Sequence, residues 1–291
     1  MAMTGGAVAT TLPPAATTAT PPAVSHEVIP PTCEGTLRDI APLMELSGAE
    51  APSAPRRTAR NWPTLSVVVP VFNEARTLRT LVGRVLASEF VTEVLLVDDG
   101  SSDESPTILA ELAQQPRVLV LTHPQNRGKG AAIRTGFAHA SADVVVVQDA
   151  DLEYHPRDFE RLLEPLAEDR ADVVFGSRFL STDGVRVPLA LHRFANRVLT
   201  WFSNRLTGLA LTDMETCYKA IRRELLAGLR LREDRFSIEP EITAKLARAP
   251  GVRIREVPIQ YDGRRHAEGK KISWRDGFAA LWAIVKYRFT D

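Results

Sequence analysis

The chain has 291 residues, of which 44% are hydrophobic and 25% are charged, a composition typical of a globular protein with one substantial core. Its 36 basic and 36 acidic residues balance, which argues against the positive field of a nucleic-acid-binding protein. No apolar run approaches the roughly 20 residues that cross a bilayer, and prolines interrupt the N-terminus, where a secretory signal is therefore not expected. Cys33 and Cys217 lack metal-site spacing, so we expect reduced thiols in a cytoplasmic protein.

The N-terminal segment differs in texture from the rest of the chain. Half of the 20 prolines fall in residues 1–63, among Ala and Thr and with few large apolar side chains. Such a segment buries too little apolar surface to offset the entropy of folding. We therefore expect a disordered arm over residues 1–62 and one folded domain over residues 63–291.

From residue 65 onward, short β-branched runs alternate with helical patterns. The expected strands cover residues 65–71, 93–97, 117–121, 144–148 and 172–176, and the helices between them cover 75–87, 104–114, 130–140 and 156–168. This alternation predicts a Rossmann-like α/β fold with a mostly parallel sheet, helices on both faces, and ligands at the carboxyl ends of the strands. The remainder is helix-rich, with helices expected at 189–206, 238–249 and 274–289 and a strand at 253–261.

Two acidic residues, Asp149 and Asp151, directly follow the apolar run at 144–148. Carboxylates at the end of a buried strand are costly to desolvate unless a cation shares them, and Mg²⁺ or Mn²⁺ is the usual partner. The sequence therefore predicts a divalent-metal site here. The alternative is that both residues only cap the helix that begins near Pro156.

Other polar motifs also follow strands. Glu74 and Asp99 stand where a carboxylate can accept hydrogen bonds from a nucleoside. The turn at 126–130 contains Lys129 between two glycines, and it suits a phosphate contact and a purely structural turn equally well because it matches no standard nucleotide fingerprint. Arg178 follows the expected strand at 172–176, where it could meet a phosphate or pair with Asp149.

Five segments resemble, in order and spacing, the family-two glycosyltransferases of GT-A fold. They are Pro70-Val71-Phe72-Asn73-Glu74, Val97-Asp98-Asp99-Gly100-Ser101-Ser102-Asp103, Asn126-Arg127-Gly128-Lys129-Gly130, Asp149-Ala150-Asp151-Leu152-Glu153 and Gly176-Ser177-Arg178. Within that family they are most similar to the dolichyl- and polyprenyl-phosphate sugar synthases, the dolichyl-phosphate mannosyltransferase group. The similarity covers about residues 64–288.

The resemblance implies a role for each matched residue in holding the donor. Asp149 and Asp151 would bind the metal that bridges the diphosphate of a UDP- or GDP-sugar. Arg178 would lie near the phosphates or the acceptor. The nucleoside and phosphate contacts would come from Pro70, Phe72, Glu74, Asp99, Lys129 and Ala150. Glu153 replaces the Gln of many mannosyl relatives, which leaves the donor sugar open.

The same resemblance extends to the acceptor side. Thr212-Asp213-Met214-Glu215-Thr216-Cys217-Tyr218-Lys219 is similar to an acceptor segment, and the basic run at 264–271 is similar to a closing loop whose Arg264 and Lys270 would neutralise phosphates. The implied reaction is a direct, inverting displacement by a polyprenyl phosphate oxygen. Because a phosphate monoester is largely ionised near neutral pH, Asp213 would orient the acceptor rather than deprotonate it.

A lipid acceptor implies contact with a membrane. Leu191, Phe194, Val198, Trp201 and Phe202 recur at helical spacing beside Arg193, Arg197 and Arg205. This pattern is typical of a helix that lies in the interface at the cytoplasmic face of a bilayer, and also of a helix packed on a protein core.

Two other functions are compatible with the motifs. One is a family-two transferase with a soluble or glycan acceptor, and the other is a nucleotide-sugar-binding protein without turnover. A sugar nucleotidyltransferase is disfavoured, because it would carry a glycine-rich basic loop after the first strand, where this chain has Phe72 and Glu74.

Overall fold

The computed structural model describes residues 61–180, 190–263 and 274–290, with side chains from Arg193 and from Gly277 in the last two ranges. Residues 1–60 of the expected arm, together with Arg264 and Lys270 of the expected closing loop, lie outside the described residues. The folded unit includes Trp62, whose ring packs edge-on against Phe90 with the centroids 5.0 Å apart.

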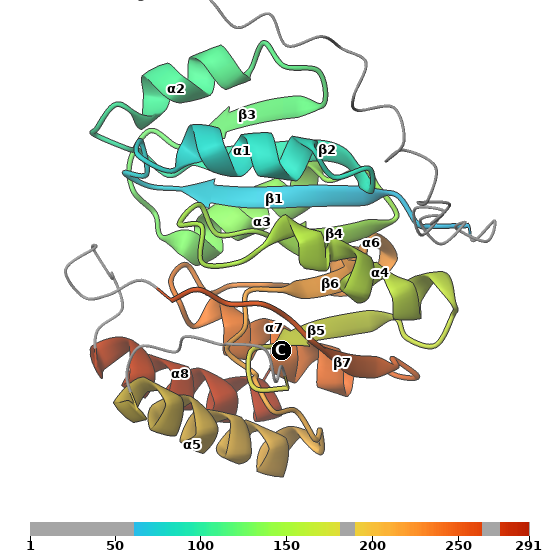
Figure 1. The fold of residues 1–291 in the computed structure, drawn as a ribbon. Helices are drawn as coiled ribbons and strands as arrows, with labels where there is room; N and C mark the ends of the chain where they lie inside the picture. The colour runs from blue at the N-terminus through green and yellow to red at the C-terminus, as the bar shows by residue number, and fades with distance from the viewer. Residues whose placement is uncertain (1–60, 181–189, 264–273, 291) are drawn as a thin grey trace, which may run out of the picture. The chain divides into compact units, whose positions relative to one another are not determined.

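A seven-stranded sheet with the order β3-β2-β1-β4-β6-β5-β7 forms the centre of the fold (Figure 1). The strands are β1 (Leu65–Val71), β2 (Val91–Asp98), β3 (Val118–Thr122), β4 (Val144–Val147), β5 (Val173–Ser177), β6 (Lys219–Arg222) and β7 (Ile254–Pro258). β4 is wholly apolar, and β1, β2 and β5 are mostly apolar, because both faces of the sheet are covered at its centre. β1 pairs in parallel with β2 and with β4, as expected from the βαβ pattern.

One strand was not expected from the sequence. β6 lies between β4 and β5 and is antiparallel to both, with Ile221 opposite Val145 and Val173. It is short and begins with Lys219, whose side chain is 2% exposed. A strand that begins with a buried charge gives no apolar signal, so only its partners identify it.

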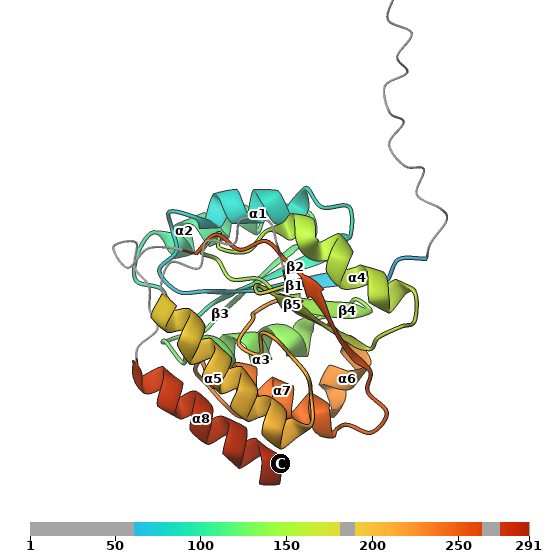
Figure 2. The same ribbon diagram turned by 60° about the horizontal axis from the view of Figure 1, so that its bottom comes forward.

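Helices cover both faces of the sheet (Figure 2). They are α1 (Leu78–Leu86), α2 (Ser105–Leu112), α3 (Lys129–His139), α4 (Phe159–Ala167), α5 (Ala190–Thr207), α6 (Arg223–Gly228), α7 (Ile238–Arg248) and α8 (Trp274–Phe289), with a 3₁₀ turn at Pro156–Asp158. α1, α2 and α4 share one apolar cluster with the sheet, and α3 and α7 share another on the opposite face. α5 and α8 lie side by side beyond α7 (Figures 1 and 2).

The first helix is shorter than expected. It begins at Leu78 rather than at residue 75, because Asn73 has a φ of 54° and a turn follows in which the Thr77 N–H donates to the Glu74 carbonyl. The order of the strands creates a switch point at β1, since the chain runs outward through β2 and β3 and then returns to β4 on the other side. Open α/β sheets bind ligands at the carboxyl ends of the strands beside such a point.

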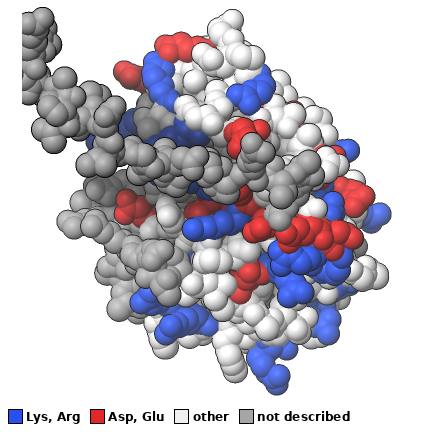
Figure 3. Space-filling model, turned by 45° about the vertical axis from the view of Figure 1, so that its right-hand side comes forward, with Lys and Arg blue, Asp and Glu red and all other residues white. Residues whose placement is uncertain are grey.

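The described surface carries charges of both signs. Lys and Arg side chains lie beside Asp and Glu side chains on the face shown in Figure 3. Within the described ranges, each helix is either too short or too polar to span a bilayer.

Candidate active site

The loops after β1 and β2 are fastened to each other at the switch point. The Asn73 N–H donates to Ser101 Oγ at 3.0 Å, and Asn73 Oδ1 accepts from the backbone N–H of Ser102 at 2.8 Å. The Glu74 N–H donates to Ser105 Oγ at 3.0 Å. Phe72 and Glu74, two of the expected nucleoside contacts, are therefore held on a bonded turn, and Pro70 precedes it in β1; all three are partly exposed.

Asp99 holds the next loop in place. Its carboxylate accepts from the backbone N–H of Arg127 at 2.9 Å and of Gly128 at 2.7 Å, and His123 Nδ1 lies 2.7 Å from Oδ1. Asp99 is 2% exposed. Asp99 therefore stabilises the loop at 126–130, and its expected contact with a nucleoside stays a prediction.

The glycines of this loop serve a close approach between two backbone segments. A Cβ on Gly128, whose φ is +104°, would lie 2.3 Å from the Asp234 carbonyl oxygen, and one on Gly130 would lie 2.3 Å from that of Glu233. Any side chain at either position would clash with backbone. The structural role considered for the loop is therefore seen in these contacts, and the phosphate contact stays a prediction.

Lys129 extends from this loop to Asp149, at the end of β4. Its Nζ lies 2.7 Å from Asp149 Oδ1 and donates to Cys217 Sγ at 2.9 Å. The Cys217 thiol donates to Asp149 Oδ2 at 2.6 Å. Burial raises the pKa of Asp149, but Lys129 and the hydrogen bonds outweigh it and the pKa is lowered overall. Asp149 is therefore an anion, and Lys129 is its present counter-ion.

Asp151 and Glu153 complete the acidic turn. Asp151 Oδ1 accepts from the Glu153 N–H at 3.1 Å, and Glu153 accepts a hydrogen bond from the Tyr261 hydroxyl. Ala150, between Asp149 and Asp151, is buried. Glu153 thus joins the turn to the segment after β7, and this hydrogen bond accounts for the burial of its carboxylate. Its expected contact with the donor stays a prediction.

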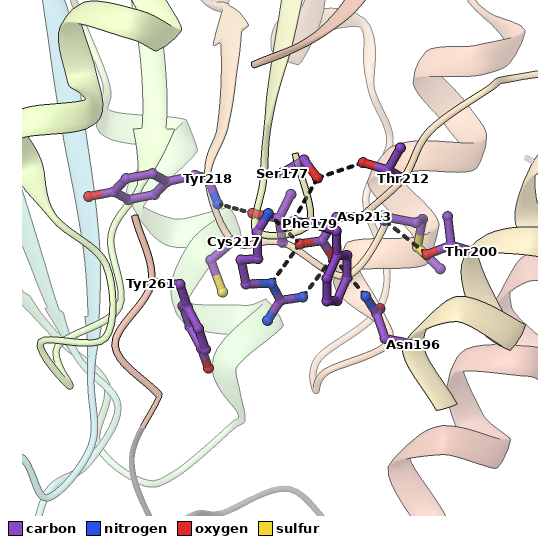
Figure 4. Close-up of polar contacts among 12 residues, drawn as sticks. Ser177, Phe179, Asn196, Thr200, Thr212, Asp213, Cys217, Tyr218 and Tyr261 are labelled. Carbon is purple, nitrogen blue, oxygen red and sulfur yellow. Dashed lines mark hydrogen bonds and ion pairs between the residues drawn. The ribbon is translucent and has the colours of Figure 1, made fainter. Parts of the chain in front are cut away.

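Arg178 pairs with Asp213. Its Nε and Nη2 donate to the two oxygens of Asp213 at 2.6 and 2.7 Å. Asp213 is fully buried and also accepts from Asn196 Nδ2 at 2.9 Å (Figure 4). Burial raises the pKa of Asp213, but Arg178 more than offsets it. The suggested pair of Arg178 with Asp149 is therefore wrong, since Lys129 occupies that place.

Four of the expected site residues lie together at one edge of the sheet. Asp149, Asp151, Lys129 and Arg178 lie at the carboxyl edge of the sheet, and Arg178 helps to lower the pKa of Asp149. Three contributors were not expected. Cys217 contacts Asp149, Tyr261 contacts Glu153 and lies under the Arg178 guanidinium at 5.1 Å, and Asn196 supports Asp213.

A row of buried charges continues behind the acidic turn. Lys129 Nζ lies 3.9 Å from Glu239 Oε1, and Glu239 Oε2 accepts from Lys219. Glu215 follows, and its Oε1 is buried without a hydrogen-bond partner among the described residues. Burial raises the pKa of Glu215 to about 7, with Lys219 opposing the shift.

We expect Glu215 to make folding stability depend on pH. A carboxyl whose pKa rises on folding from 4.5 to about 7 binds more protons in the folded chain, so its contribution is present below pH 4.5 and is lost as pH rises through 7. Glu215→Gln should remove up to about 3 kcal/mol of that loss. Urea denaturation at pH 5 and pH 8 would show it, with the exposed Glu224→Gln as control. An unchanged pH profile in Glu215→Gln would contradict the assignment.

The acidic turn suits a cation that is shared with a substrate. Within the described residues, no three or more His, Cys, Asp or Glu side chains gather as a metal cage. Mg²⁺ typically binds one or two carboxylates together with substrate phosphates. Asp149 and Asp151 match that donor set, provided that the cation shares or displaces Lys129 on Asp149.

The chain matches the protein-family model described as glycosyl transferase family 2 over residues 66–230. An undecaprenyl-phosphate 4-deoxy-4-formamido-L-arabinose transferase from Edwardsiella ictaluri is 34% identical over 212 residues, which are 71% of this chain and 62% of that protein. The chain thus spans less than two thirds of that relative's length. An uncharacterized protein of Methanocaldococcus jannaschii is 27% identical and is covered to 92%.

Solved structures with the same fold include glucosyl-3-phosphoglycerate synthase from Mycobacterium tuberculosis in complex with UDP. The TM-score is 0.62 at 21% identity, over 79% of this chain and 81% of that one. The same enzyme in complex with Mn²⁺, UDP and phosphoglyceric acid gives a TM-score of 0.61. This likeness confirms the expected GT-A fold.

Proposed function

The chain belongs to glycosyl transferase family 2, and on that premise we propose that it transfers a hexose from a UDP- or GDP-sugar to a polyprenyl phosphate with inversion. The observation that carries the proposal is that Asp149 and Asp151 lie at the same edge of the sheet as the Arg178–Asp213 pair, near enough for Arg178 to lower the pKa of Asp149. The relatives named as undecaprenyl-phosphate sugar transferases support the choice of acceptor.

We assign the donor to the carboxyl ends of β1 and β4. Pro70 near the end of β1, and Phe72 and Glu74 on the turn that follows, would contact the nucleoside, and so would Asp99, which holds the neighbouring loop. Asp149 and Asp151 would hold Mg²⁺ or Mn²⁺ together with the diphosphate. A divalent cation bound there supplies Lewis-acid stabilisation to the departing nucleoside diphosphate.

The chain's own residues would manage the charge around the reaction. Lys129 is buried against Asp149, and although burial lowers its pKa, Asp149, Cys217 and Glu239 together raise it well above the ordinary value, so it stays cationic. A fixed cation near the diphosphate would stabilise the leaving group. The Tyr261 hydroxyl donates a hydrogen bond to Glu153 and so holds the acidic turn in place.

Arg178 would meet the acceptor. Two of its N–H groups bind Asp213, and its planar fork carries further donors suited to a phosphate. Asp213 is fully buried and bonded on both oxygens, so it would position Arg178 rather than touch the substrate. The acceptor phosphate is itself the nucleophile and needs no general base, because its second pKa is about 6. Arg264 and Lys270 would add charge at this side.

A second candidate is transfer to a soluble phosphate-bearing acid. The likeness to glucosyl-3-phosphoglycerate synthase favours it, since the fold of that enzyme matches over 79% of this chain.

One experiment separates the candidates. The protein would be incubated with a panel of UDP- and GDP-sugars, Mg²⁺ or Mn²⁺, and either undecaprenyl phosphate in vesicles or 3-phosphoglycerate. Mass spectrometry of the organic and aqueous phases would identify the product. A glycolipid supports the proposal, a water-soluble glycoside supports the second candidate, and donor binding without either product would leave only a nucleotide-sugar-binding protein.

We further propose that α5 and α8 dock on the cytoplasmic surface of a membrane. Phe194 and Trp201 on α5 are each 64% exposed, and Phe278 and Trp282 on α8 are each 67% exposed. Exposed aromatic side chains on adjoining helices are typical of interfacial helices. Arg193, Arg197 and Arg205 are exposed on α5 and suit anionic headgroups. Phe202, expected on the lipid side, is half-buried against the core instead, and the side chain of Leu191 is not described.

Flotation with vesicles tests the docking. We expect Trp201→Ser and Trp282→Ser each to weaken binding to phosphatidylglycerol vesicles by about 10-fold, since burying an aromatic side chain contributes about 1.5–3 kcal/mol. Leu119→Ser is the control, because Leu119 is 43% exposed but lies on β3 at the far end of the sheet. A wild-type protein that stays wholly at the bottom of the gradient would contradict the docking.

A further inference from the structure

α5 turns three polar side chains toward the protein, next to the partly buried Leu199, Phe202 and Leu206. Asn196, Thr200 and Ser203 are 8%, 4% and 1% exposed, whereas the exposed fractions of Phe194 and Trp201 are both 64%. A helix on a protein core normally presents the opposite arrangement. Buried polar side chains are tolerated only when they find hydrogen-bond partners. The partners on this side of α5 therefore show which part of the protein the helix is bonded to.

The partners of Asn196, Thr200 and Asn204 lie in the short segment that carries Asp213. Asn196 Nδ2 donates to Asp213 Oδ1 at 2.9 Å, and Thr200 Oγ1 accepts from the Met214 N–H at 3.2 Å. Asn204 Nδ2 donates to the Leu211 carbonyl at 2.8 Å, and its Oδ1 accepts from the Leu211 N–H at 3.1 Å. Figure 4 shows Asn196 and Thr200 extending from the helix to this segment. α5 is therefore fastened to residues 211–214 over two turns.

The fastening continues to Arg178. Asp213 accepts from the backbone N–H of Arg178 at 3.1 Å as well as from its guanidinium. A movement of α5 thus reaches the guanidinium through two hydrogen-bonded steps, from Asn196 to Asp213 and from Asp213 to Arg178. Asn196 Oδ1 is buried and has no hydrogen-bond partner among the described residues. The junction is not fully bonded, so a small shift of the helix that satisfies this oxygen would be favourable.

We propose that α5 couples contact with a lipid surface to the placement of Arg178, with Asn196 as the positioning residue. The inference rests on the proposed sugar transfer and on the docking of α5. A ligand shifts a conformational equilibrium only by binding one state more tightly than the other. Here the bilayer is the ligand, and it would favour the position of α5 in which Phe194 and Trp201 are buried most deeply in the lipid. A lipid surface would then stimulate transfer even when that surface contains no acceptor.

The test separates the surface from the acceptor. Transfer to geranyl phosphate, a short water-soluble prenyl phosphate, would be measured with and without acceptor-free vesicles of phosphatidylglycerol and phosphatidylcholine. We expect the vesicles to raise kcat of the wild type about 5- to 20-fold, in the usual range of coupling between two sites. The KM for geranyl phosphate should change little.

Variants locate the coupling. Asn196→Ala should still float with vesicles but lose the stimulation, measured as the ratio of the transfer rates with and without vesicles. A purely structural defect would lower both rates and leave this ratio unchanged. Ser203→Ala, a buried polar change on the same side of α5, should keep the full ratio. Trp201→Ser should lose flotation and stimulation together. Full stimulation in Asn196→Ala would overturn the role of this residue.

A measurement on the wild type avoids any folding defect of a variant. Hydrogen exchange should slow in peptides that cover residues 211–214 when vesicles are added, together with peptides from α5. Protection of α5 alone would overturn the coupling. Transfer to geranyl phosphate without stimulation by bound vesicles would also overturn it and leave the proposed function intact. Failure to transfer to any prenyl phosphate would refute the proposed function and the coupling with it.

Discussion

Replacing Asp149 by Asn should lower kcat for sugar transfer by about 10²–10³-fold, the usual effect of removing one group that stabilises charge in a transition state. The substitution would remove a proposed ligand of the cation, and it leaves Lys129 without its counter-ion at 2.7 Å. Asp151→Asn should reduce kcat similarly but leave Lys129 paired. Steady-state kinetics and the binding of Mn²⁺ in the presence of UDP or GDP, followed by electron paramagnetic resonance, would measure both effects.

The same strand supplies a matched control. Asp143 stands at the other end of β4, where its carboxylate accepts from the Thr64 N–H at 3.0 Å and the Thr64 hydroxyl at 2.7 Å. Asp143→Asn should leave kcat and Mn²⁺ binding near those of the wild type. If Asp149→Asn and Asp151→Asn both kept Mn²⁺ binding and turnover, the metal site would have to be sought elsewhere.

The second large effect concerns the Arg178–Asp213 pair. Asp213→Asn should destabilise the fold by about 3–5 kcal/mol, because it leaves a guanidinium that is only 15% exposed without a full counter-charge. It should also lower the rate of transfer, since Arg178 loses its orientation. Guanidinium-chloride denaturation and initial rates with saturating donor would measure the two effects.

A double variant separates stability from function at this pair. Arg178→Met combined with Asp213→Leu should recover most of the lost stability, because apolar replacement of a buried ion pair is often neutral, yet it should remain inactive. The exposed pair of Arg79 and Glu111, with an N–O contact of 2.6 Å, is the control, and Glu111→Gln should cost less than about 1 kcal/mol. A double variant that transfers sugar normally would contradict a role for Arg178 at the acceptor.

Much of the fold could be predicted from local patterns. The apolar runs that became β1, β4 and β5 are bounded by polar motifs, and parallel strands bring such ends to one edge, so Asp149 and Arg178 were expected near each other. β6 could not be predicted, because its place between β4 and β5 depends on pairing with Val145 and Val173, far away in the sequence.

The partners within the site were harder to predict than its position. Cys217 and Lys129 are separated by 88 residues, and nothing local marks the thiol as a contact of Asp149. The orientation of α5 was also undetermined, since an apolar stripe at helical spacing fits lipid and core alike. Only the burial of Asn196 and Thr200 shows which side faces the protein.

The row from Asp149 through Lys129, Glu239 and Lys219 to Glu215 also restricts how this chain can vary. Negative and positive groups alternate along it, and they sum to zero when Glu215 holds its proton. Losing one of the four charged members, Asp149, Lys129, Glu239 or Lys219, leaves an unbalanced charge in a poorly solvated place. Tolerated exchanges at these four positions should therefore occur as pairs of opposite sign, and related chains that lack Lys219 should lack an acidic group at position 239 as well.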